Sequence, residues 1–322
     1  MIVPAWNEEE HIEACVRSIL EQHVDGGLEV VVADGNSRDR TAALARRAGA
    51  VVVENFDGST PAGLNAALAH ARGDVVVRFD AHAEMPADYV AACLRALDRE
   101  RGATCVGGWR RVAGRGPWGR ATAAALGSRL GVGNPGLWRE PSAGEQPHET
   151  DTVALGCWPA DQLRAIGGWN ERYVRNQDFE LNHRLRRAGG RVVFDPQIWS
   201  IYKPRESPAA IARQYWQYGR FKALLLAEEP RSLRPRQLAP VGLLAATALA
   251  VLPGVARGAA RLGLGVYAAT LAAVAVRTTA GWRTAAVFVT MHGAWGAGLA
   301  VGTAEVGAKG LHARILRVAE DR

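Results

Sequence analysis

Three aspartates occupy positions in the sequence where a carboxylate could bind a ligand or act as a base. Asp34 and Asp80 each follow a short apolar run, and Asp178 begins a helical pattern. After a strand, the Asp34 carboxylate can accept a hydrogen bond from the imide N–H of uracil or position a ribose. At a helix N-terminus, Asp178 stays ionised and can act as a general base toward an acceptor hydroxyl. The alternatives are an Asx turn at the first position and a helix cap at the last.

Residues 80–82 read Asp-Ala-His. One intervening residue can turn Asp80 and His82 toward one cation that bridges two phosphate oxygens, where a divalent metal neutralises a leaving diphosphate. An isolated Asp-x-His commonly arises by chance. Its place after a predicted strand, downstream of Asp34, favours a metal and phosphate site here.

Two further segments carry polar groups that suit the same chemistry. Pro4, Glu8 and Glu9 stand at the mouth of the first predicted strand, although the dipole of a helix also favours acids in its first turn. Gln217 and Arg220 lie on a predicted helix that combines amides, aromatic rings and cations. Arg220 could neutralise a diphosphate while the aromatic rings stack on a sugar. An interfacial helix with an aromatic belt is the alternative, and both can hold.

Apolar runs and helical patterns alternate through the first hundred residues. The predicted helices are 9–22, 40–48, 61–72 and 86–97, and the predicted strands are 28–33, 50–53, 74–79 and 104–107. Polar residues that collect at strand ends predict an α/β fold with a mostly parallel sheet, helices on both faces and a ligand crevice at those ends. Ile2 and Val3 look like the tail of a buried strand, which is either short or begins upstream of Met1.

The second half of the chain is less regular. Residues 107–150 are rich in Gly, Pro and Trp and form a stretch longer than an ordinary connection, which predicts a substrate-facing region. Beyond it, 178–188 and 208–227 are predicted helices and 191–194 is a predicted strand.

Three apolar runs close the chain, at 238–256, 262–276 and 284–301. The first and third come closest to the roughly 20 residues that cross a bilayer, and the middle one is marginal. Their abundance of Ala, Gly, Val and Leu, with almost no acid, favours membrane contact over a soluble helical cap.

Composition narrows the class of protein. The chain has 322 residues, 48% of them hydrophobic, and a net charge of +7. Much of the excess arginine flanks the apolar runs, which favours anionic lipid over nucleic acid as the partner, since no basic stripe is interleaved with aromatics. The four cysteines show no CxxC pair and read as buried hydrophobes in a reducing compartment. No signal peptide opens the sequence, so we expect the catalytic part in the cytoplasm, at the inner membrane.

Together these segments resemble glycosyltransferase family 2 and, within it, the succinoglycan-biosynthesis (ExoA-like) branch. The match covers nearly the whole chain and its order is specific. In the first hundred residues, Val3–Glu9 resembles the family motif VPxxNEE, Ala33–Thr41 resembles DGxSxDxT, and Gly63–Asn65 with Gly73–Asp74 resembles an N…GD segment. Asp80–His82 resembles the DxD site. Further along, Asn176–Leu185 resembles NQDxELNxRL, and Gln217–Phe221 resembles QxxRW.

The resemblance implies a GT-A fold, which is a Rossmann-like nucleotide-sugar-binding sheet, here followed by hydrophobic helices. It also implies a UDP-sugar donor, a Mg²⁺ or Mn²⁺ ion, and inversion at the anomeric carbon by in-line attack. Asp178 would be the catalytic base, and Asp80 with His82 would be the metal site. The nucleotide-sugar contacts would come from the other motif residues together with Asp80: Pro4, Glu8, Glu9, Asp34, Asn65, Gln217 and Arg220.

The sequence departs from the wider family at three motif positions. His82 stands where aspartate is usual, and one fewer negative charge weakens metal binding in principle. Direct ligation by His82 and the preferred metal are therefore open. Gln177 stands where glutamate is frequent, and Phe221 replaces tryptophan.

The expected function is transfer of a hexose, with glucose the usual sugar of the branch, from a UDP-sugar to a lipid-linked (polyprenyl diphosphate) oligosaccharide in exopolysaccharide biosynthesis. Residues 1–230 would form the catalytic domain, with a nucleotide-binding half at 1–100 and an acceptor-side half at 101–230, and 231–322 a membrane-associated helical region. The alternatives are a polyprenyl-phosphate acceptor, a processive synthase, which the short membrane region disfavours, and a non-catalytic membrane scaffold, which the three aspartates argue against.

Overall fold

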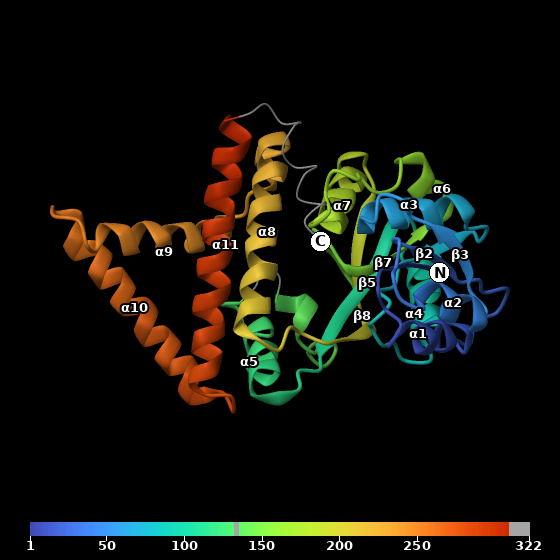
Figure 1. The fold of residues 1–322 in the computed structure, drawn as a ribbon, viewed down its shortest axis with the longest axis horizontal. Coiled ribbons are helices and arrows are strands. Elements are labelled where there is room, and N and C mark those ends of the chain that lie inside the picture. The colour runs from blue at the N-terminus through green and yellow to red at the C-terminus, as the bar shows by residue number, and fades with distance from the viewer. Residues whose placement is uncertain (132–134, 309–322) are drawn as a thin grey trace. The chain divides into compact units, whose positions relative to one another are not determined.

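The computed structural model describes residues 1–131 and 135–308 (Figure 1). The chain divides into two compact units, Met1–Arg111 with Arg139–Tyr202, and Val112–Trp138 with Lys203–Arg322. These bounds differ from the domains expected at 1–230 and 231–322. Helices α5 (Gly116–Leu126) and α8 (Pro208–Glu228) belong to the second unit with the C-terminal helices. A functional division at residue 230 stays a prediction.

A mixed sheet forms the centre of the first unit. Parallel strands β1 (Ile2–Ala5), β2 (Val31–Asp34) and β3 (Val51–Glu54) pair in that order. The other strands run in the order β4-β7-β5-β8-β6, where β4 is Val75–Val77, β5 is Ala103–Val112, β6 is His148–Glu149, β7 is Ala154–Pro159 and β8 is Arg191–Tyr202. A parallel bridge between Ile2 and Arg78 joins the two groups, so β1 and β4 end at the same edge of the sheet.

Helices lie on both sides of this sheet, as Figure 1 shows. They are α1 (Ile12–Leu20), α2 (Thr41–Arg47), α3 (Thr60–His70), α4 (Tyr89–Arg99), α6 (Ala160–Ala165) and α7 (Gln177–Arg187). Apolar residues at helical spacing face the sheet: Ile12, Val16 and Ile19 of α1 are fully buried. The expected strand and helix alternation of the first hundred residues is confirmed, with shifts of a few residues at the ends of elements.

The middle of the chain is more regular than its composition indicates. Residues 107–150 are not one irregular stretch, because they contain the end of β5, helix α5 and strand β6. The sequence also gives little sign of β7, whose Gly156 interrupts the apolar run. That glycine is required by packing, since a Cβ there would lie 2.5 Å from the Trp158 ring. Strand β7 pairs antiparallel with both β4 and β5 and is buried between them.

In the second unit, α8 and α11 (Trp282–Ala308) pack side by side. Glycines allow the backbones to approach: a Cβ on Gly219 would lie 2.1 Å from the Trp295 carbonyl oxygen, and one on Gly298 2.2 Å from the Trp216 carbonyl oxygen. Close contact through small residues is common between membrane helices.

Among the described residues, two helices are long and apolar enough to cross a membrane, α10 (Ala256–Arg277) and α11. The expectation that the first apolar run comes close to a full span is wrong, because α9 (Leu238–Leu249) has only 12 residues and ends before Pro253 and Gly254. The middle run, expected to be marginal, instead belongs to a helix of 22 residues. At 1.5 Å per residue such a helix is roughly as long as the hydrocarbon core is thick.

Candidate functional site

Asp34 ends β2, beside Ala5 of β1. Its Oδ2 accepts a hydrogen bond from the Ser37 backbone N–H (3.2 Å). Its Oδ1 is buried and meets no donor among the residues that the structure describes. A buried acceptor of this kind indicates a place where a ligand N–H or O–H can bind.

The turn after β1 is tied to the turn after β2 by backbone donors. The backbone N–H groups of Asn7 and Glu8 donate to the hydroxyls of Ser37 (2.9 Å) and Thr41 (2.7 Å), and the Glu9 N–H donates to Asp39. The two acids then differ: the half-buried Glu9 carboxylate accepts from Arg40, whereas the Glu8 carboxylate accepts from His82. Pro4 lies within β1, half-buried. These contacts hold the expected nucleotide-binding turns in one place.

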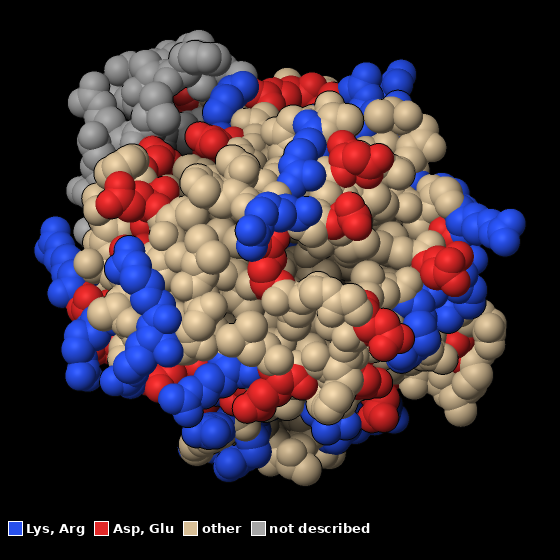
Figure 2. Space-filling view, turned by 90° about the vertical axis from the view of Figure 1, so that its right-hand side faces the viewer, with Lys and Arg blue, Asp and Glu red and all other residues tan. Residues whose placement is uncertain are grey.

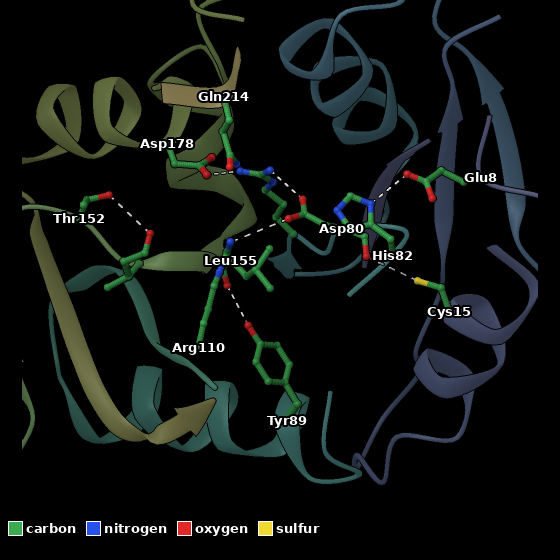
Figure 3. Close-up of polar contacts among 12 residues, drawn as sticks. Glu8, Cys15, Asp80, His82, Tyr89, Arg110, Thr152, Leu155, Asp178 and Gln214 are labelled. Carbon is green, nitrogen blue, oxygen red and sulfur yellow. Dashed lines mark hydrogen bonds and ion pairs between the residues drawn. The ribbon is translucent and has the colours of Figure 1, made fainter. Parts of the chain in front are cut away.

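Arg78 donates hydrogen bonds to both Asp178 and Asp80, the two aspartates labelled in Figure 3. Its side chain is 5% exposed. One terminal nitrogen, Nη2, donates to Asp80 Oδ1 at 2.8 Å, and the other, Nη1, donates to Asp178 Oδ2. The structure thus brings two of the expected aspartates together through a residue that the motifs do not include.

Electrostatics at Asp80 favour the ionised carboxylate. Burial alone would raise its pKa, but the guanidinium groups of Arg78 and Arg110 outweigh burial and lower the pKa of Asp80 to about 2. Arg110 Nη2 lies 3.8 Å from Asp80 Oδ2, and the Arg110 guanidinium also sits over the Tyr202 ring. Burial would lower the pKa of Arg78, but Asp178 and Asp80 together raise it. Both shifts favour the charged forms of Asp80 and Arg78.

Asp178 is the second residue of α7, where the helix dipole favours a negative charge. Asn176, at the N-cap, has a left-handed backbone (φ 63°) that turns the chain into the helix. The Trp169 indole N–H donates to Asp178 Oδ1 (3.2 Å), so each carboxylate oxygen accepts one hydrogen bond from the part of the chain that the structure describes. A carboxylate oxygen has two lone pairs, and one on each oxygen remains for a substrate hydroxyl.

The Asn65 side chain of α3 holds the backbone of Trp169 in place. Its amide accepts from the Trp169 backbone N–H and donates to the Trp169 carbonyl, both at 2.8 Å. The expected contact of Asn65 with a nucleotide sugar stays a prediction; in this structure the side chain supports the partner of Asp178.

Asp80 and His82 offer two candidate metal ligands. The Glu8 carboxylate accepts from His82 Nδ1 (2.9 Å), which assigns the proton to that nitrogen if Glu8 is ionised. Within residues 1–131 and 135–308, no three His, Cys, Asp or Glu side chains converge as a metal cage. The pair fits a Mg²⁺-like ion that takes most of its ligands from water and substrate phosphates, as such ions commonly do.

Gln217 and Arg220 lie on α8, in the second unit. The Arg220 guanidinium makes a bidentate ion pair with the Glu305 carboxylate of α11, with N–O distances of 2.8 and 3.0 Å. Contacts of these two residues with a nucleotide sugar stay predictions.

Sequence reasoning missed three residues of the site: Arg78, Arg110 and Trp169. Only Arg78 left a signal, because a single arginine interrupts the apolar run from Val75 to Phe79 immediately before Asp80. A charged residue there is costly unless it is paired. The surface charge does not mark the site either. On the face drawn in Figure 2, acidic and basic side chains are interspersed, and no broad patch of one sign appears.

Comparisons with known proteins agree with these observations. A family model described as glycosyl transferase family 2 matches residues 1–160. The succinoglycan biosynthesis protein ExoA of Rhizobium meliloti (strain 1021) is 30% identical over 316 residues, which are 92% of each chain. A dolichyl N-acetyl-alpha-D-glucosaminyl phosphate 3-beta-D-2,3-diacetamido-2,3-dideoxy-beta-D-glucuronosyltransferase of Methanococcus voltae is 22% identical over 239 residues, 70% of this chain and 73% of that one.

A solved structure shows the fold. The mannosyltransferase PcManGT from Pyrobaculum calidifontis, in complex with GDP-Man and Mn²⁺, is 21% identical, with a TM-score of 0.59 over 90% of this chain and 85% of that one. The sheet with helices on both sides, the two apolar C-terminal helices and the relationship to ExoA confirm the expected fold and family. The chain belongs to glycosyltransferase family 2, in its ExoA-like branch, and is a glycosyltransferase with a GT-A fold.

Proposed function

We propose that the protein transfers a hexose from a UDP-sugar to a lipid-linked oligosaccharide, with inversion at the anomeric carbon, in exopolysaccharide biosynthesis. The observation that carries this proposal is the cluster in which Arg78 joins Asp80, on the expected diphosphate side, to Asp178, on the expected acceptor side. The similarity to ExoA along 92% of the chain supports the biosynthetic context.

In the proposed reaction, Asp178 takes the proton of the acceptor hydroxyl. The acceptor oxygen forms a bond to the anomeric carbon while the bond from that carbon to the diphosphate breaks, and UDP leaves with the electron pair. A general base of this kind commonly contributes about 100-fold or more to the rate. The buried Asp34 Oδ1 suits the imide N–H of uracil.

A divalent ion, Mg²⁺ or Mn²⁺, would be held by Asp80 and His82 together with the diphosphate, and would supply positive charge to the leaving group. Glu8 orients His82 for this role by accepting from Nδ1. Arg78 and Arg110 already face Asp80, so we expect the ion to bind weakly without a nucleotide.

We propose further that the enzyme works at the cytoplasmic face of the inner membrane, with α10 and α11 in contact with lipid. The apolar side chains of Val255, Leu262 and Val276 are exposed, which suits lipid better than water. An acceptor anchored in the same leaflet would meet the enzyme at a raised effective concentration. Polyprenyl phosphate is the alternative acceptor.

The experiment is an assay of nucleoside diphosphate release on membranes that contain the full chain, with a panel of UDP-hexoses and GDP-mannose, lipid-linked saccharides and Mn²⁺. Asp178→Asn should lower kcat by about 100-fold or more while UDP binding survives. Asp161→Asn is the matched control, because Asp161 is exposed and also stands second in its helix, α6. It should leave kcat unchanged.

Each part of the proposal has its own contrary result. Wild-type kcat in Asp178→Asn would reject the base. Turnover of GDP-mannose but of no UDP-hexose would reject the donor, and release that persists at full rate after EDTA treatment would reject the metal. No transfer from any nucleotide sugar would reject the transferase reaction in this form.

A further inference from the structure

Arg78 is a buried cation shared by two carboxylates from different parts of the chain. It follows β4, between Val77 and Phe79, both of which are buried. A charge in such a position is stable only when it is paired and hydrogen-bonded. Asp80 lies two residues further along the chain, whereas Asp178 reaches Arg78 from the start of α7.

The shape of the arginine side chain matters here. A guanidinium is a rigid planar fork, so its two terminal nitrogens fix the separation and orientation of the carboxylates that they hold. Nη1 and Nη2 of Arg78 each take one aspartate. A lysine at this position would keep the charge but has a single nitrogen and no fixed plane.

We propose that Arg78 is a positioning residue that sets the direction of the Asp178 carboxylate relative to Asp80. This inference rests on the proposed role of Asp178 as the base. Trp169 holds one oxygen of Asp178 and Arg78 holds the other, so the carboxylate cannot rotate without losing a hydrogen bond. The remaining lone pairs then point in fixed directions, which is what in-line attack on a bound donor requires.

A purely structural ion pair makes a different prediction. Arg99 of α4 pairs with Asp195 of β8, a buried aspartate that lies outside the Arg78 cluster. Both arginines neutralise a poorly exposed carboxylate within the first unit, but only Arg78 contacts the proposed base. Arg99→Met is therefore the matched control for Arg78→Met.

The test is a double-mutant cycle on kcat, measured by UDP release from UDP-glucose with lipid-linked saccharides. Arg78→Met should lower kcat by about 100-fold, which is typical of a misplaced catalytic group, and should change the donor KM much less. Arg78→Lys should lower kcat by about 10-fold or more because one contact is lost. Arg99→Met should lower Tm and leave kcat within about twofold.

The decisive comparison is made in the Asp178→Asn background. If Arg78 acts through the base, adding Arg78→Met to Asp178→Asn costs no more than about a further twofold in kcat. A full additional 100-fold loss would show that Arg78 acts elsewhere and would overturn the inference. If Arg78→Met does not fold, as judged by Tm and UDP binding, Arg78→Lys enters the same cycle.

The two proposals fail in different ways. An active wild type whose Arg78→Lys and Arg78→Met variants keep full kcat overturns the inference alone. An active wild type whose Asp178→Asn variant keeps full kcat overturns the assignment of the base, and the inference with it.

Discussion

Asp178 accepts a hydrogen bond from the Trp169 indole N–H as well as from Arg78. The two donors differ in kind, because one is neutral and the other is charged. A neutral donor orients the carboxylate at a small cost to its basicity, whereas a charged donor also stabilises the ionised form. A substitution at Trp169 therefore tests how the orientation of the Asp178 carboxylate affects the rate, without changing the charge beside it.

Trp169→Phe tests the orienting hydrogen bond without changing the charge at the site. Phenylalanine keeps an aromatic ring near Trp158, whose ring centroid lies 5.3 Å from that of Trp169, but it removes the N–H donor and part of the buried ring volume. A hydrogen bond worth about 1 kcal/mol predicts a loss of roughly fivefold in kcat. Steady-state kinetics would measure it, with UDP affinity as the check on folding. An unchanged kcat would mean that Arg78 suffices to hold the base.

At the scale of elements, the start of α7 decides where Asp178 points. Asn176 adopts φ 63°, a left-handed conformation that asparagine tolerates better than most residues and glycine better still. Within 1–131 and 135–308, three other non-glycine residues share positive φ, and two of them, Asn7 and Asn36, lie in the turns that follow β1 and β2. Left-handed residues thus recur where the chain leaves a strand or enters a helix at the site.

Asn176→Ala and Asn176→Gly form a matched pair that tests this geometry. Alanine should destabilise the protein by about 1 kcal/mol and lower kcat, because the left-handed conformation strains a Cβ. Glycine adopts the same conformation without strain and should keep more of both. Thermal unfolding and UDP-release kinetics distinguish them. Equal behaviour of the two variants would show that the backbone conformation is unimportant to the site.

The sequence predicted those elements whose pattern is local. Asp34 and Asp80 follow apolar runs, so their places were predictable: Asp34 is the last residue of β2, and Asp80 lies three residues beyond the end of β4. Strand β7 was missed because pairing with β4 and β5 across the sheet, rather than a local pattern, defines it. The role of Arg78 was missed for the same reason: its partner Asp178 comes from a distant part of the chain. Distances between such residues are set by tertiary packing, which spacing along the sequence does not reveal.

At the scale of the molecule, the second unit has the composition of a membrane attachment. Helix α10 buries few of its residues within the protein, and basic side chains lie at or near its ends, among them Arg257 and Arg277. Apolar helices with arginine at their borders are typical of contact with anionic lipid.

This attachment predicts how the protein fractionates. The full chain should sediment with membranes and stay there in about 1 M salt, which shortens the Debye length to roughly 3 Å and removes charge attraction. Detergent should release it, because burial of apolar surface survives salt. Western blotting of the fractions gives the answer. Complete release by salt alone would show that arginine and lipid charges, rather than apolar helices, hold the protein.

The close contact of α8 with α11 has a consequence for biosynthesis. Gly219 of α8 and Gly298 of α11 each face a carbonyl oxygen of the opposite helix, so each helix covers part of the surface of the other. A ribosome completes α8 well before it reaches Trp282, where α11 begins. During that interval the surface of α8 that meets α11 has no partner from its own chain. A premature stop upstream of Trp282 would leave it permanently bare, a form that cellular proteases readily recognise.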